Sequence, residues 1–145
     1  MAEGCRIELI DSHSVTMGLG LIAMAAARAA QAGQGIDEVA TVARDAIAKV
    51  RLLGTLDTLK YVQRGGRVSK VQALFGTMLD INVLLTMHDG ELVPVGRVRT
   101  RSKAIERLDS FVRDAASIDE LAVMYSTDLD EARGPGVLGV GLRLR

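Results

Sequence analysis

Apolar residues recur at helical spacing in the first half of the chain and at alternate positions in the second half. The apolar run at 15–27, rich in glycine and alanine, predicts a buried helix with Ser14 or Thr16 as its N-cap. A second predicted helix follows, with Asp37 as its N-cap. Asp89-Gly90 lies between two alternating segments and favours a tight hairpin turn. The remaining predicted elements are strands at 5–10 and 52–56, short helices after Asp57 and Ser69, hairpin strands at 80–87 and 91–98, a helix from Thr100 or Ser102, and strands at 120–126 and 137–145.

This order of helices and strands predicts an α/β fold. The length of 145 residues is that of one domain. Lysine plus arginine and aspartate plus glutamate each number 18, so no net field attracts polyanions. Aromatic residues make up only 3% of the chain, which provides poorly for stacking on bases. We therefore expect no nucleic-acid partner.

The sequence favours a cytoplasmic protein without a membrane span. Cys5 is the only cysteine, so no intramolecular disulfide can form, which is usual in a reducing compartment. The longest apolar run, residues 15–27, is shorter than the ~20 residues that a spanning helix needs. Acidic residues precede it, whereas a signal peptide begins with basic residues.

Two glycine-containing turns allow more than one interpretation. The stretch DSHSVTMGLG at 11–20 could hold an anion at a helix N-terminus, but it lacks a complete nucleotide-binding motif, and a capped, buried helix fits its spacing better. In RGGRVSK at 64–70, basic side chains could grip an acidic group. Glycines that stop one helix before a serine that caps the next explain the same residues.

The stretch GRVRTRSKAIER at 96–107 is the most basic part of the chain. Alternate residues of a strand share a face, so Arg97, Arg99 and Arg101 could meet a phosphate or an acidic partner, or form a solvated edge. His13 and His88 fall in turns, and no histidine or cysteine has the spacing of metal ligands. The residues therefore predict neither a metal site nor a catalytic group, and we expect no enzyme activity of the chain alone.

The ordered motifs resemble the DegV family. LIDSHSVTMGLG, TLDTLKYVQRGGRVS and ALFGTMLDINVLLTMHDGELVPVGRVRTRSKAIERL carry the resemblance from about residue 5 to 111, and GPGVLGVG resumes it. Membership implies a two-domain α/β fold that holds one long-chain fatty acid in a buried slot. In bacteria such a protein presents the acyl carboxylate to a fatty acid kinase subunit and is not itself the enzyme. No cofactor is implied beyond the bound fatty acid.

The resemblance also assigns candidate residues. Asp11, Ser12, Gly18 and Gly20 match the family's D-S and G-x-G turn, and Arg67 matches its G-G-R turn, so these are the expected ligand-binding residues. Arg99 matches the arginine tied to kinase engagement, with Arg101 as the runner-up. On this basis residues 1–79 are a remnant of the first domain, and residues 80–145 are the C-terminal α/β domain with a mixed sheet and a β-hairpin.

Several family features have no counterpart in this chain. The opening D-S-T strand and the T-S-x-x-S-G loop that binds the carboxylate are missing, and Ala132 stands where the family has a histidine. A helix and a strand are also missing before RGPG. The strand at 5–10 should therefore lack neighbours and invite self-association or a partner chain. The alternative function is thus a non-binding half of a split or decayed DegV protein that folds with a partner.

Overall fold

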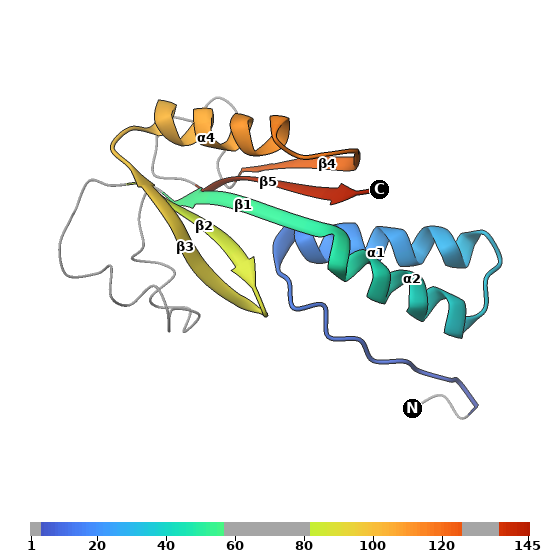
Figure 1. The fold of residues 1–145 in the computed structure, drawn as a ribbon. Helices are drawn as coiled ribbons and strands as arrows, with labels where there is room; N and C mark the ends of the chain where they lie inside the picture. The colour runs from blue at the N-terminus through green and yellow to red at the C-terminus, as the bar shows by residue number, and fades with distance from the viewer. Residues whose placement is uncertain (1–3, 57–81, 126–136) are drawn as a thin grey trace.

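The computed structural model of the chain describes residues 4–56, 82–125 and 137–145 (Figure 1). The described helices and strands follow the order that the apolar spacing predicted. The short helices expected after Asp57 and Ser69, and the RGGR turn, lie outside the described residues. The elements are α1 (Thr16–Gln31), α2 (Ile36–Lys49), β1 (Val50–Leu56), β2 (Asn82–His88), β3 (Glu91–Val98), α4 (Arg101–Arg113), β4 (Ile118–Tyr125) and β5 (Val137–Leu144).

The five strands form one sheet in the order β3-β2-β1-β5-β4, and each neighbouring pair is antiparallel. The α/β fold class is confirmed, but the expected mixed sheet is wrong for the described strands. The reason is that β5, the last strand, enters between β1 and β4 and runs antiparallel to both. The boundary expected at residues 79–80 lies outside the described residues, and the two-domain division stays a prediction. Strand β1 belongs to the predicted first domain at 1–79, but it pairs with β2 and β5 of the predicted second domain at 80–145.

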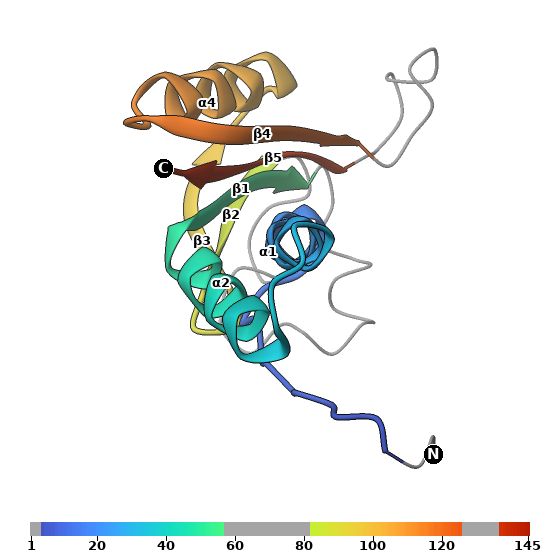
Figure 2. The same ribbon diagram turned by 90° about the vertical axis from the view of Figure 1, so that its right-hand side faces the viewer.

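Helices cover both faces of the sheet (Figures 1 and 2). On one face α4 buries Ala104 and Leu108 against Leu53, Leu84 and Val140 of the strands. On the other face α1 approaches β5, where Leu21 and Met17 lie over Gly141. The second helix packs against the first through small side chains. These are Ile22 and Ala25 of α1 with Ala43 and Ala46 of α2.

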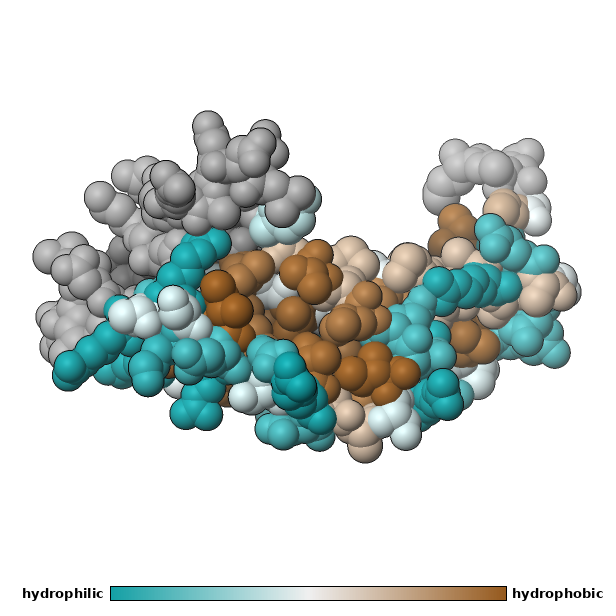
Figure 3. All heavy atoms as spheres, turned by 90° about the horizontal axis from the view of Figure 1, so that it is seen from above, coloured by the Kyte–Doolittle hydropathy of each residue, from teal (hydrophilic) through white to brown (hydrophobic). Residues whose placement is uncertain are grey.

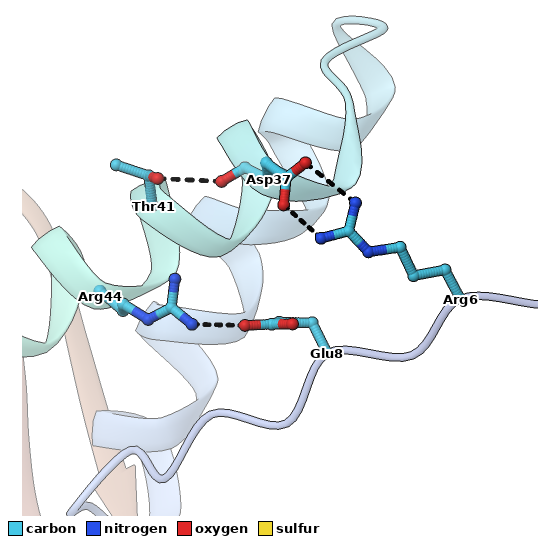
Figure 4. A network of polar contacts seen from close by, with 5 residues as sticks. All are labelled: Arg6, Glu8, Asp37, Thr41 and Arg44. Carbon is cyan, nitrogen blue, oxygen red and sulfur yellow. Dashed lines mark hydrogen bonds and ion pairs between the residues drawn. The ribbon is translucent and has the colours of Figure 1, made fainter.

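The strand expected at residues 5–10 is wrong, because this segment has no strand partner among the described residues. Its polar side chains instead reach α2 (Figure 4). Arg6 donates to Asp37 with one N–O distance of 2.9 Å, and Arg44 donates to Glu8 at 2.5 Å. The Arg6 guanidinium holds the pKa of the Asp37 carboxyl below its usual value through its hydrogen bond and its charge. Ile7 and Leu9 of this segment are exposed, as the lack of strand neighbours predicts, whereas Ile10 is half-buried against α1 and α2.

Two of the predicted helix caps are wrong. Val15 is the N-cap of α1 and makes no side-chain cap hydrogen bond. Gly35 is the N-cap of α2, and its amide donates to the Glu38 carboxylate at 2.9 Å, so Asp37 is not the cap. Two other local predictions are confirmed: Thr100 caps α4 by accepting from the Lys103 amide, and Asp89 and Gly90 form the β2–β3 turn with positive φ angles. The cap expected at Ser69 lies outside the described residues.

Helix α1 is the longest described helix, with 16 residues. No helix in the three described ranges combines the length and the apolar character that crossing a bilayer would demand.

Candidate functional site

The turn before α1 is held by its own side chains. Asp11 Oδ1 accepts from the His13 amide at 2.9 Å, and Ser12 Oγ lies 3.3 Å from both the amide and the carbonyl oxygen of Ser14. His13 and Thr16 have φ angles of 47° and 51°. Non-glycine residues seldom adopt this left-handed conformation, and such strain gathers at functional sites. The turn is therefore an ordered and strained feature rather than a loose connection.

This turn lies between the start of α1 and the tip of the β2–β3 hairpin. Ser14 Oγ occupies the space beside Gly18, since a Cβ at Gly18 would stand 2.1 Å from that oxygen. On the other side His13 Nδ1 lies 3.3 Å from the Cβ position of Gly90. Gly18 is therefore required by close packing, as the buried-helix interpretation expects. The same packing fixes the positions of the Ser14 and His13 side chains.

The turn offers hydrogen-bond donors to a polar or anionic group. Ser12 and Ser14 carry hydroxyls, His13 carries an imidazole, and the first amides of α1 have no side-chain cap. Unpaired amides and the helix dipole favour a negative charge at a helix N-terminus. Asp11 brings a carboxylate to the same turn, but that carboxylate accepts from His13 and orders the turn. Asp11 thus orders the turn, and the hydroxyls and amides are the groups of the turn that can donate hydrogen bonds.

Beside the start of α1 the sheet is lined by glycines. Gly54 of β1 lies opposite Gly139 of β5, and Gly141 lies opposite Leu52. Side chains of α1 lie over Gly141, whereas the described atoms within 4 Å of the Cβ position of Gly54 are only backbone atoms of β5. Met124 closes one side, with its Cε 3.2 Å from the Cβ position of Gly139. We call Gly54, Gly139 and Gly141 the glycine floor; it lies on the face of the sheet that α1 approaches.

A network of ion pairs holds α1 on the sheet. Glu120 of β4 accepts from Arg28 of α1 and from Arg143 of β5, the latter at 2.9 Å. Arg143 also pairs with Asp119. Burial raises the pKa of Glu120, but the hydrogen bonds and the charges of Arg28 and Arg143 together outweigh it and hold that pKa below its usual value. The network fixes the end of α1 that lies away from the turn.

The structure brings some of the sequence-predicted residues together. Asp11, Ser12, Gly18 and Gly20 all lie at the start of α1, and a Cβ at Gly20 would stand 3.1 Å from Met17 Sδ. Arg67 lies outside the described residues. No observation tests whether these residues bind a ligand, so that role stays a prediction.

Arg99 and Arg101 lie at a different place in the fold. Arg99 follows the end of β3 and Arg101 begins α4, whereas the turn contacts Gly90 just before the start of β3. A strand of eight residues spans roughly 26 Å at about 3.3 Å a residue. The predicted partner-binding arginines are therefore separated from the turn by the length of β3.

Sequence reasoning missed two features of the site. It placed His13 and His88 in turns and did not foresee that His13 lies against the hairpin tip. It also missed the glycine floor, although a signal was present. Gly139 and Gly141 are two apart in a predicted strand, so they had to share a face. Among the described residues no group of three or more potential ligands could hold a metal ion.

Comparison with known proteins gives one consistent family. The family model described as "Uncharacterised protein, DegV family" matches residues 1–135. A DegV domain-containing protein of Streptomyces coelicolor is 41% identical over 110 residues, which are 76% of this chain and 39% of that protein. A DegV domain-containing protein of Mycobacterium tuberculosis is 40% identical over 129 residues, which are 86% of this chain and 45% of that protein. The chain thus spans less than half the length of these relatives.

Solved structures share the fold. A fatty-acid-binding DegV family protein from Thermus thermophilus superposes with a TM-score of 0.81 at 22% identity and covers 98% of this chain and 62% of that one. A DegV family protein from Eubacterium eligens, loaded with heptadecanoic acid, gives a TM-score of 0.77 at 20% identity, covering 97% and 62%. At these identities the superposition establishes the fold, not the ligand of this chain.

Proposed function

Because the chain belongs to the DegV family, we propose that it binds one long-chain fatty acid and acts as a carrier rather than an enzyme. The observation that carries the proposal is the family match over residues 1–135, together with the fatty-acid-binding proteins that share the fold. The turn at 11–14 and the start of α1 provide donors for the carboxylate. The glycine floor provides an apolar surface for the tail.

The tail supplies most of the expected affinity. Burying a methylene group stabilises a bound chain by roughly 0.8 kcal/mol, so a long acyl chain gains much even beside a weak polar contact. In the part of the chain that the structure describes, the donors nearest the glycine floor are Ser12, Ser14 and the amides of α1. Neutral hydrogen bonds contribute about 1 kcal/mol each, and those to a charged group about twice that. We therefore expect binding that is sensitive to chain length and less sensitive to the head group.

The test is extraction of the purified chain with organic solvent, followed by mass spectrometry, and then uptake of palmitate or oleate. The informative variant is Gly54→Val. The Cβ position of Gly54 has its nearest described atoms at 3.6 and 3.9 Å, so the backbone tolerates the side chain while the side chain fills the floor. We expect reduced acyl content with an unchanged melting temperature. Gly35→Ala is the control, because its added Cβ would meet only Glu38 at 3.9 Å among described atoms.

A chain that retains no acyl ligand and takes up neither palmitate nor oleate would contradict the proposal. So would a Gly54→Val variant that binds as much fatty acid as the unchanged protein, because the glycine floor would then not be the tail site.

We further propose that the chain presents the acyl carboxylate to a fatty acid kinase through Arg99 and Arg101. Both arginines follow the end of β3, away from the turn. Acyl phosphate formation by an added kinase should fall in Arg99→Ala and Arg101→Ala, with acyl content unchanged. Arg113→Ala, at the other end of α4, is the control. Equal rates for all three variants would remove the arginines from the interface.

The second candidate is a half-protein that folds with a partner chain. It is favoured by the extended segment at 5–10, where Ile7 is 71% and Leu9 is 90% exposed. A partner strand beside this segment would bury both. A cooperative melt of the purified chain at low concentration would reject this candidate, whereas the fatty-acid proposal predicts that melt.

A further inference from the structure

The sheet has an edge strand on each side, and the two differ in how they resist pairing. Edge strand β3 contains Pro94, which has no amide hydrogen, and its register with β2 shifts at the same place. Arg97 adds an exposed charge to it. Proline, bulges and charges are the usual means by which edge strands avoid other strands. The other edge, β4, has no proline, and its one irregularity lies at its start, between Ile118 and Glu120.

Strand β4 presents an apolar row on the face that α4 partly covers. Leu121, Val123 and Tyr125 are 49%, 60% and 53% exposed. They lie opposite Leu142, Val140 and Leu138 of β5, which belong to that face. Figure 3 looks down on this side of the molecule and shows apolar side chains gathered at its middle, beside polar surface. Within the described residues β4 pairs only with β5.

The charges of β4 lie at one end and are already neutralised. Asp119 and Glu120 pair with Arg143, and Glu120 also pairs with Arg28. The stretch from Leu121 to Tyr125 carries no charge. In an antiparallel pair of two β4 strands the acidic ends would lie at opposite ends of the interface. In a parallel pair they would lie side by side within the interface, where both ion-pair networks would lose contact with water.

We propose that β4 pairs with β4 of a second copy of this chain about a two-fold axis at Val123. This register places Val123 opposite Val123 and Leu121 opposite Tyr125, and it keeps Asp119 and Glu120 outside the paired segment. A two-fold axis perpendicular to the sheet keeps like faces together, so the apolar rows of both copies meet between the two α4 helices. The result is one continuous sheet, held by main-chain hydrogen bonds and by the apolar row.

The interface is small, and this sets what to expect in solution. Each copy contributes one short strand and three half-exposed side chains. Such a contact falls below the ~1,200 Å² that marks the lower limit of standard interfaces, so the dimer should dissociate on dilution. This proposal does not rest on fatty-acid binding, and fatty-acid extraction does not test it.

The experiment is sedimentation velocity of the full chain from micromolar to millimolar concentration. We expect a monomer–dimer equilibrium that Val123→Lys abolishes, because two ammonium groups would face each other across the axis. Val95→Lys is the matched control, since Val95 is 56% exposed on the other edge strand. Mixing Val123→Lys with Val123→Glu should restore a dimer, because opposite charges then face each other.

A second measurement covers a lysine variant that fails to fold. In a Cys5→Ser background, Val123→Cys should form a disulfide-linked dimer under mild oxidation, because opposed residues lie about 4.5–5.5 Å apart between Cα atoms. Val95→Cys should not. A monomer at every concentration would overturn the proposal. So would a dimer that Val123→Lys leaves intact or that Val95→Lys weakens equally, a mixture that stays monomeric, or equal cross-linking of both cysteine variants.

Discussion

Glu120→Gln should destabilise the protein by about 2 kcal/mol, because hydrogen bonds to charged groups contribute roughly 1.5–3 kcal/mol and glutamine keeps one acceptor. The Glu120 side chain is 16% exposed and that of Arg143 is 18% exposed, so their pairing is poorly screened by water. The Arg28 side chain is 56% exposed, so its ion pair with Glu120 contributes little to the stability of the fold. Asp119 still pairs with Arg143 in the variant. The loss therefore stays below the 3–5 kcal/mol typical of an isolated buried charge.

Urea denaturation at neutral pH measures this loss, and Asp109→Asn is the control. Asp109 pairs with Arg113 one helical turn away, at 2.7 Å, but their side chains are 56% and 76% exposed. Exposed pairs of this kind contribute about 0.3–0.5 kcal/mol. A Glu120→Gln variant that loses no more stability than Asp109→Asn would refute the view that the network anchors α1.

The pH dependence of the same variant gives an independent test. The pKa of Glu120 is lowered in the folded protein, so its carboxylate stabilises the fold at pH values above the pKa of the unfolded chain. That contribution disappears as the pH falls through the lowered folded pKa. The stability difference between the unchanged protein and Glu120→Gln should therefore be constant near neutral pH and shrink in acid. A difference that persists unchanged in strong acid would mean that packing, not charge, explains the loss.

Three further substitutions test the core and the hairpin. Leu142→Ala should cost about 3 kcal/mol in urea denaturation, because Leu142 is 1% exposed and its removal leaves a cavity. Thr55→Val should raise the melting temperature, since the fully buried Thr55 hydroxyl has no hydrogen-bond partner among the described residues and an unsatisfied buried group costs about 1–3 kcal/mol. Gly90→Ala should cost roughly 1–2 kcal/mol, because φ at Gly90 is +79° and His13 crowds its Cβ position. An unchanged denaturation midpoint would contradict the expectation for Leu142→Ala or Gly90→Ala. A lowered melting temperature would contradict the expectation for Thr55→Val.

Local patterns predicted most of the described elements because their causes are local. Thr100 precedes an amphipathic run and caps α4, and Asp89-Gly90 supplies the positive φ angles of the hairpin turn. Both effects depend on residues within a few positions along the chain. The family resemblance added what spacing alone could not, since the fold of a relative includes contacts between distant segments.

The errors came from interactions between distant residues. The segment at 5–10 has the composition of a strand, but a strand needs a neighbour to accept its hydrogen bonds, and no described strand lies beside it. The direction of β5 depends on the position at which the chain returns to the sheet. The apolar pattern of residues 137–145 predicts a strand but not that position. The same holds for Glu120, whose partners Arg28 and Arg143 lie 92 and 23 positions away. The sequence pattern placed Glu120 on a strand but could not identify either partner.

Fatty-acid binding and dimerisation through β4 involve opposite faces of β4, so we expect them to be independent. On one face of β4, Glu120 and Met124 contact α1 and the edge of the glycine floor. On the other face, Leu121, Val123 and Tyr125 form the row that a second copy would cover. A two-fold axis perpendicular to the sheet leaves the α1 face of both copies open, so dimerisation should neither block nor require fatty-acid binding. Added oleate should therefore leave the sedimentation equilibrium unchanged, and Val123→Lys should leave acyl content unchanged. A dimer that forms only with bound fatty acid would place the ligand on the α4 side and contradict the tail site beside α1.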